Sequence, residues 1–185
     1  ANQFFESGQQ LNIIAVGGYG RKEFYPYSDT DLLILLNRNT KNELKNNISI
    51  FLTFLWDVGI EASHSSRTIS ESIKESKKDI SVGTSILESR FLFGSENLFL
   101  EFNEKVLKKN VWKNQKFLNA KLDEQVKRHN NYNNTAYNLE PNIKDGPGGL
   151  RDIHTIYWIS KKLGINNIKG FVDKDILNDK QTQLL

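Results

Sequence analysis

The sequence predicts an α+β (mixed α/β) protein, in which a small sheet with flanking helices is followed by an all-helical lobe. Apolar runs at residues 11–16 and 32–36 have the length and the Ile, Leu and Val content of buried strands. Beyond about residue 70, apolar residues recur at helical rather than alternating intervals. We therefore expect a core domain over residues 1–70 and a helical lobe over residues 71–185.

The composition is that of a folded globular protein. The 185 residues are 38% hydrophobic and 25% charged, and the length is sufficient for one sizeable core with a helical appendage. The chain has no cysteine, which excludes disulfides and thiolate metal sites, and no stretch has the features of a signal peptide or membrane helix. We therefore expect a cytoplasmic protein that does not bind membranes. Since the chain begins at Ala1, we also expect a fragment or a processed form.

The segment between the two predicted strands joins a glycine turn to a pair of carboxylates. Gly17 and Gly18 end the first strand, and Asp29 and Asp31 lead into the second. Side chains two residues apart on a strand face the same way, so the carboxylates should point together, with Cα atoms about 6.6 Å apart. Two ionised carboxylates about 6 Å apart repel by roughly 2.8 kcal/mol at an effective dielectric of about 20, so a cation should lie between them.

Mg²⁺ is the cation that such a pair favours. It prefers oxygen ligands and is usually held by one or two carboxylates together with substrate phosphates. Glycines let backbone amides approach a polyphosphate closely, and Arg21 and Ser28 add donors on the same segment. The combination predicts phosphoryl-transfer chemistry, whereas the glycines alone fit a plain turn equally well.

A third acidic residue follows the predicted covering helix. Residues 41–58 carry apolar side chains at helical intervals, and Gly59 is placed to end that helix. Residues 60–64 then predict a short strand that contains Glu61. A third carboxylate on a neighbouring strand suits a two-metal site, in which one cation activates the acceptor hydroxyl and the other holds the triphosphate. The alternative for Glu61 is an exposed position on the solvent face of the strand.

Two basic residues and a series of helices complete the middle of the chain. His64 and Arg67 each fit a hydrogen-bonded structural role, and Arg67 also fits a contact to phosphate. Apolar residues at helical spacing then predict helices around residues 80–91, 98–107 and 117–126.

A glycine-rich loop spans residues 138–152 of the predicted lobe. Turn-forming residues lie on both sides of Lys144, and a helix is expected to begin near Asp152. Lys144, Arg151 and nearby backbone amides would then face an anion. The alternative is an interhelical loop that an ion pair between Arg151 and Asp152 holds together.

Two segments of the chain resemble a known family. Gly-Gly, a short spacer and then Asp-x-Asp opening an apolar strand is similar to the signature of the DNA polymerase beta-like nucleotidyltransferase superfamily. Residues 17–33, Gly-Gly-Tyr-Gly-Arg-x-Glu-x-x-Pro-x-Ser-Asp-x-Asp-Leu-Leu, resemble the protein-PII uridylyltransferases. Residues 138–153, Asn-Leu-Glu-Pro-x-Ile-Lys-x-x-Pro-Gly-Gly-Leu-Arg-Asp-Ile, resemble the segment that follows the nucleotidyltransferase core in that family. The likeness covers roughly residues 16–160.

The resemblance implies a nucleotidyltransferase-type sheet and a specific reaction. UMP would pass from UTP to a tyrosine hydroxyl of the PII signalling protein, with release of pyrophosphate. No histidine of this chain is followed by aspartate, so the uridylyl-removing activity of the family's HD-type domain cannot reside here. Two Mg²⁺ ions would be held by Asp29, Asp31 and Glu61, and the nucleotide would be contacted by Gly17, Gly18, Arg21, Ser28, Lys144 and Arg151.

Two alternatives remain open from the sequence. One is an adenylyltransferase of the same superfamily that acts on glutamine synthetase, because no residue pattern reads a uracil edge. The other is a nucleotide-sensing module that binds without turnover. Nucleic acid is not favoured as a partner, because no basic stripe with interleaved aromatic residues is visible, and the net charge of +3 comes from lysines scattered among acids.

Overall fold

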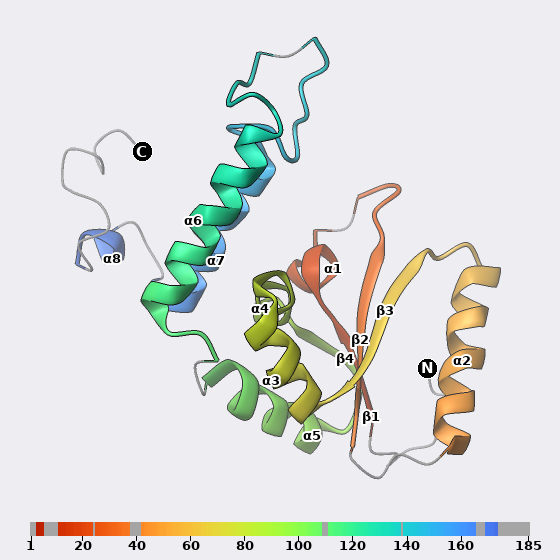
Figure 1. Cartoon of the computed structure of the whole chain (residues 1–185). Coiled ribbons are helices and arrows are strands. Elements are labelled where there is room, and N and C mark those ends of the chain that lie inside the picture. The colour runs from red at the N-terminus through yellow and green to blue at the C-terminus, as the bar shows by residue number, and fades with distance from the viewer. Residues whose placement is uncertain are drawn as a thin grey trace. The chain divides into compact units, whose positions relative to one another are not determined.

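The structure is a computed structural model that describes residues 3–5, 11–23, 25–37, 42–108, 111–137, 139–165 and 169–173. The chain forms two compact units, Ala1–Val111 and Trp112–Leu185. The first unit contains the sheet, and the second is built from helices (Figure 1). The predicted mixed class of helices and sheet is therefore confirmed.

The sheet of the first unit is mixed, with its described strands in the order β3-β2-β1-β4. β1 pairs antiparallel with both β2 and β4, whereas β2 and β3 run parallel. The parallel pair is joined through helix α2, as a crossover connection requires. The strand bounds are β1 Leu11–Ala15, β2 Thr30–Leu36, β3 Ala62–Thr68 and β4 Arg90–Gly94.

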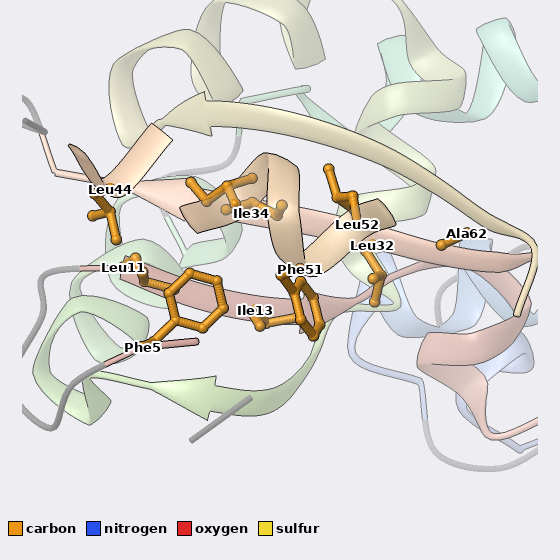
Figure 2. Close-up of a cluster of buried hydrophobic side chains, with 10 residues drawn as sticks. Phe5, Leu11, Ile13, Leu32, Ile34, Leu44, Phe51, Leu52 and Ala62 are labelled. Atoms are coloured by element: carbon orange, nitrogen blue, oxygen red, sulfur yellow. The ribbon is translucent and has the colours of Figure 1, made fainter. Parts of the chain in front are cut away.

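One face of the sheet is covered by α2 (Asn42–Asp57), as the helical spacing of its apolar residues predicts (Figure 1). Leu32 and Ile34 of β2 point to this face and pack against the apolar stripe of the helix. Figure 2 shows these side chains of β1, β2 and α2 pointing toward one another. Gly59 follows the helix with φ +80°, which confirms its predicted role at the C-terminal end.

The opposite face of the sheet is covered by short helices (Figure 1). Leu33 and Leu35 of β2 point to this side and form a second buried cluster with Ile86 and Phe102. Since both faces of β2 are buried, the strand is apolar at consecutive positions instead of alternating. The elements on this side are α3 Ile69–Lys78, α4 Ile80–Leu87, α5 Glu96–Phe102 and a π-helix, η1, Asn103–Lys108, whereas α1 Gly17–Arg21 follows β1 at the end of the sheet.

The expectation that residues 71–185 are entirely helical is wrong for one segment. Residues 90–94 form β4, which pairs with β1 and extends the sheet beyond the expected boundary near residue 70. The run Phe91-Leu92-Phe93 is too short for its periodicity to distinguish a strand from part of a helix. Pairing with β1, a contact between distant parts of the chain, decides its conformation.

The second unit is built around two helices, α6 (Asn114–Asn130) and α7 (Leu150–Leu163), with the short α8 (Lys169–Val172) after them. The helices predicted around residues 117–126 and near Asp152 are confirmed. Phe117, Trp158 and Ile159 are buried in this unit. Among the described residues, no helix has the length and hydrophobicity needed to span a membrane.

Candidate active site

The site centres on the contact between Gly17 and Asp31. A Cβ atom on Gly17 would lie 2.7 Å from Oδ2 of Asp31 and would push that carboxylate aside, and the φ of +56° favours glycine. The backbone N–H of Val16 donates to the Asp31 carbonyl oxygen at 3.1 Å, which ties the end of β1 to the start of β2. The predicted glycine turn is in fact the first turn of the short helix α1.

The other two acidic residues lie just ahead of the parallel strands. Asp29 directly precedes β2 and Glu61 directly precedes β3, and both are exposed. The N–H of Thr30, between the two aspartates, donates to the Glu61 carbonyl oxygen at 2.8 Å. The strand register places Asp31 opposite Ser63. The fold thus brings three acidic residues from distant parts of the sequence to the same end of neighbouring strands.

The three carboxylates are not gathered around one point. No group of three or more acidic or histidine side chains with the spacing of a metal site occurs in the parts of the chain that the structure describes. Carboxylate oxygens are nonetheless ligands that Mg²⁺ prefers. Asp31 also faces Gly17, which together with Gly18 is here called the glycine corner, where a polyphosphate can approach the backbone. The assignment of these three residues as metal ligands therefore remains a prediction.

Arg21 is engaged within the protein, beside the glycine corner. Its guanidinium donates to Glu23 at 2.8 Å and to the buried Glu88 at 2.5 Å. Burial works to lower the pKa of Arg21, but the hydrogen bonds and charges of Glu88 and Glu23 outweigh it and raise the pKa. Arg21 therefore fastens α1 to Glu88 at the end of α4, a structural partner that the sequence did not indicate.

Gly20 and Arg90 complete this attachment. A Cβ on Gly20 would lie 2.1 Å from the Glu88 carbonyl oxygen, so only glycine lets α1 pack this closely. Arg90 of β4 donates to the Tyr19 carbonyl oxygen at 2.8 Å, and its guanidinium lies 5.2 Å from the centre of the Tyr19 ring. Part of the motif Gly-Gly-Tyr-Gly-Arg thus holds the corner in place.

Ser28 closes the turn that leads into the carboxylates. Its Oγ accepts from the Tyr25 N–H at 3.2 Å, and its own N–H donates to the Tyr25 carbonyl oxygen at 3.0 Å. Tyr27 within this turn has φ +65°. The hydroxyl predicted to contact a nucleotide therefore also shapes the approach of the chain to Asp29.

A pocket of about 270 Å³ lies next to Asp31, between β2, β3 and α4. His64 and Arg67, the two uncertain residues of the sequence analysis, both line it. Ser81 and Ser85 of α4 also line the pocket. These two serines were not predicted from the sequence, because a spacing of four residues indicates only that they share one face of a helix.

In the second unit, Lys144 and Arg151 lie on the glycine-rich loop and the start of α7. The Lys144 side chain is exposed, and its carbonyl oxygen accepts from the Arg151 N–H at 2.9 Å. Nε of Arg151 lies 3.5 Å from Oδ1 of Asp145. The alternative pairing of Arg151 with Asp152 is therefore not what organises this loop.

Asp152 instead joins the loop to α6. Its carboxylate accepts hydrogen bonds from Arg128, from Gln125 at 3.0 Å and from the Gly148 N–H at 2.7 Å, and it lies 3.0 Å from His129 Nε2. Burial by itself would raise the pKa of Asp152, but these hydrogen bonds, chiefly the one from Arg128, lower it to about 2. Asp152 is therefore a structural carboxylate.

Two family models and several relatives match this chain. The nucleotidyltransferase domain family matches residues 2–132, and the family described as GlnD PII-uridylyltransferase matches residues 116–185. Three relatives are each called bifunctional uridylyltransferase/uridylyl-removing enzyme. The protein from Nitrosococcus oceani is 47% identical over 83% of this chain, that from Haemophilus influenzae 48% over 81%, and that from Stutzerimonas stutzeri 42% over 98%.

The matched regions cover 17%, 17% and 20% of these relatives, so the chain spans about a fifth of their length. The first family match includes the whole described sheet and the Gly17–Asp31 contact, and the second includes the glycine-rich loop. The two segments that carried the resemblance in the sequence thus fall in two consecutive family matches. The chain belongs to the nucleotidyltransferase family, an enzyme class, and its relatives there are the bifunctional uridylyltransferase/uridylyl-removing enzymes.

Proposed function

We propose that this chain transfers UMP from UTP to a tyrosine hydroxyl of the PII signalling protein and releases pyrophosphate. The observation that carries the proposal is the position of the Asp31 carboxylate next to Gly17. The neighbouring residue Thr30 donates its N–H to the Glu61 carbonyl oxygen, which brings the backbone of Glu61 to the same end of the sheet. This arrangement puts acidic oxygens next to Gly17 and Gly18, where the backbone carries no side chain. The names of the relatives support uridylyl transfer as the reaction.

The reaction is a displacement at the α-phosphorus. The acceptor oxygen forms a new bond to phosphorus, the bond from phosphorus to the pyrophosphate oxygen breaks, and the hydroxyl proton is lost to solvent or to a carboxylate. Asp29 and Asp31 would hold two Mg²⁺ ions, with Glu61 on the acceptor side. When bound, these ions neutralise phosphate charge and make the acceptor hydroxyl easier to deprotonate.

The remaining residues of the proposed site divide into three roles. Gly17 and Gly18 leave room for a triphosphate to lie against backbone amides. Arg21 and Ser28 shape this corner through their hydrogen bonds to Glu88 and Tyr25, in addition to the nucleotide contacts proposed for them. Lys144 and Arg151 of the second unit are proposed as phosphate contacts because they are basic and lie on a glycine-rich loop.

The direct test uses the full-length enzyme, UTP, Mg²⁺ and PII, with pyrophosphate release and the mass of PII as readouts. Asp31→Asn should lower transfer by about a thousandfold or more, because it removes a charge that holds the metal ions. Asp57→Asn, at the exposed end of α2, is the matched control and should leave the rate unchanged. Urea unfolding of both variants checks that the fold is intact.

Three outcomes would contradict the proposal. Transfer of AMP in preference to UMP would support the adenylyltransferase alternative. Binding of UTP without pyrophosphate release would support a sensing module. Full activity of the Asp31→Asn variant would show that the Asp31 carboxylate has no part in the reaction.

A further inference from the structure

The pocket beside Asp31 has an apolar floor and a polar rim. Its floor is formed by Val16, Leu33 and Ile86, which belong to the buried cluster on this face of the sheet. Its rim carries serine hydroxyls from both sides, including Ser63 on β3 and Ser85 on α4. An apolar surface with hydroxyl groups around it suits a ring that carries polar substituents.

The two ends of the pocket carry opposite charges. Asp31 lies opposite Ser63 in the parallel register, and Arg67 lies opposite Leu35, four residues further along the strand. The Cα atoms of Asp31 and Arg67 are therefore separated by about 13 Å along the strand direction. A ligand whose phosphate lies at the acidic end would extend its other end toward the guanidinium.

Arg67 has hydrogen-bond donors to offer a ligand. Within the described residues it forms no ion pair. Its charge acts on two carboxylates of α3 only as a minor contribution: the pKa of Glu71 is lowered mainly by hydrogen bonds from Thr68, and that of Glu75 mainly by a hydrogen bond from Lys78. A partly buried guanidinium at the end of a pocket is a strong recognition group for oxygen acceptors.

We infer that this pocket takes the nucleoside of the donor nucleotide and that Arg67 selects uracil by donating to a base carbonyl. The inference rests on the proposed function, in which cations held by Asp31 would bind the α-phosphate. A guanidinium has donors and no acceptor. Uracil presents a carbonyl oxygen where cytosine and adenine carry an amino group, so Arg67 favours uracil and leaves the amino groups of the other bases unpaired.

The other properties of the pocket agree with this assignment. A volume of about 270 Å³ suits a pyrimidine nucleoside, since pockets for larger ligands typically measure about 300–1,000 Å³. The serine hydroxyls can donate or accept, so they bind a base without distinguishing carbonyl from amino groups. Unlike the serine hydroxyls of the lining, the Arg67 side chain can only donate hydrogen bonds.

The sharpest test compares UTP with CTP, which differ at this position of the ring and not in size. Dissociation constants are measured by calorimetry on the full-length enzyme with Mg²⁺ and without PII, so no turnover is needed. The wild type should prefer UTP, and Arg67→Gln should reduce that preference by about tenfold, because an amide both donates and accepts. Lys77→Gln, exposed on α3, removes the same charge outside the pocket and should keep the preference.

A second variant tests the place of the nucleoside independently of Arg67. Ser85→Leu would fill the pocket from α4 and should weaken UTP and CTP equally, by about tenfold or more. Unchanged binding by Ser85→Leu, or an unchanged UTP preference in Arg67→Gln, would overturn the inference. If the wild type transfers UMP while either result is found, only this inference fails; if it transfers no UMP, the proposed function fails as well.

Discussion

The chain contains two segments that combine glycines, an arginine and aspartate, residues 17–31 in the first unit and residues 146–152 in the second. In the second segment, Asp152 is held by three side chains of α6, those of Gln125, Arg128 and His129, and by a backbone N–H of the loop. In the first, the exposed carboxylate of Asp29 makes no hydrogen bond or ion pair with any described side chain, and the same holds for Glu61, which lies beside it at the start of β3.

The difference separates a structural carboxylate from candidates for chemistry. Asp152 has its hydrogen-bonding capacity occupied, so it stabilises the loop and has little left for a ligand. Asp29 and Glu61 lie at the open start of parallel strands, where a cation can reach them. Similar residue patterns in one chain can therefore serve folding in one place and a reaction in another, and the hydrogen bonds of the carboxylates tell them apart.

Among the changes that test this comparison, the largest expected effect comes from closing the first segment. Gly17→Ala would drive a Cβ to 2.7 Å from the Asp31 carboxylate, so we expect UMP transfer to fall by about a hundredfold as that carboxylate moves. Alanine at φ +56° should also cost about 1–2 kcal/mol of unfolding free energy. The measurements are kcat for transfer to PII and urea unfolding of the full-length enzyme.

Gly59→Ala is the matched control for this variant. Gly59 also has a positive φ, +80°, but no atom lies within 4 Å of its added Cβ. It should show a similar stability loss of about 1–2 kcal/mol with no change in kcat. Equal kcat losses in the two variants would mean that the Gly17–Asp31 contact has no role beyond backbone conformation.

A smaller effect is expected from opening the second segment. Asp152→Asn removes a carboxylate whose pKa is held at about 2 against an ordinary 3.8, so it should cost about 2 kcal/mol of unfolding free energy at pH 7. Because the folded-state pKa is the lower one, this stabilisation is present above pH 4 and is lost as the pH falls toward 2. Urea midpoints from pH 7 to pH 2 should therefore converge for the two proteins. A constant difference across that range would show that the charge of Asp152 contributes nothing.

The smallest effect is expected at Lys121, a buried cation of the same unit. Its Nζ lies 2.8 Å from Glu124 and 4.2 Å from the centre of the Trp158 ring, and burial, only partly offset by Glu124, lowers its pKa. Lys121→Met keeps the buried stem and removes the desolvated charge, so unfolding free energy at pH 7 should change by less than about 1 kcal/mol. The exposed Lys127→Met is the control, and a loss well above that value in Lys121→Met alone would make the cation a stabilising element.

Much of the first unit could be predicted from local patterns. The runs at residues 11–16 and 32–36 are strands, the helical stripe of residues 41–58 is α2, and Gly59 ends it, because each of these signals depends only on neighbours in sequence. β4 could not be predicted in the same way. Three apolar residues in a row fit a helix or a strand, and only the pairing with β1 decides between them.

The sequence by itself determined the glycine turn at Gly17 and the strand that follows Asp29, since glycine freedom and strand patterning are local properties. That Gly17, Asp29 and Asp31 handle a nucleotide together stays a prediction. Only the tertiary structure decided which charges are already occupied: Arg21 by Glu88, 67 residues away, and Asp152 by Arg128, 24 residues away. It also assembled the pocket from β2, β3 and α4. The physical reason is that burial and charge pairing act through space, so they depend on how strands and helices pack and not on the order of residues along the chain.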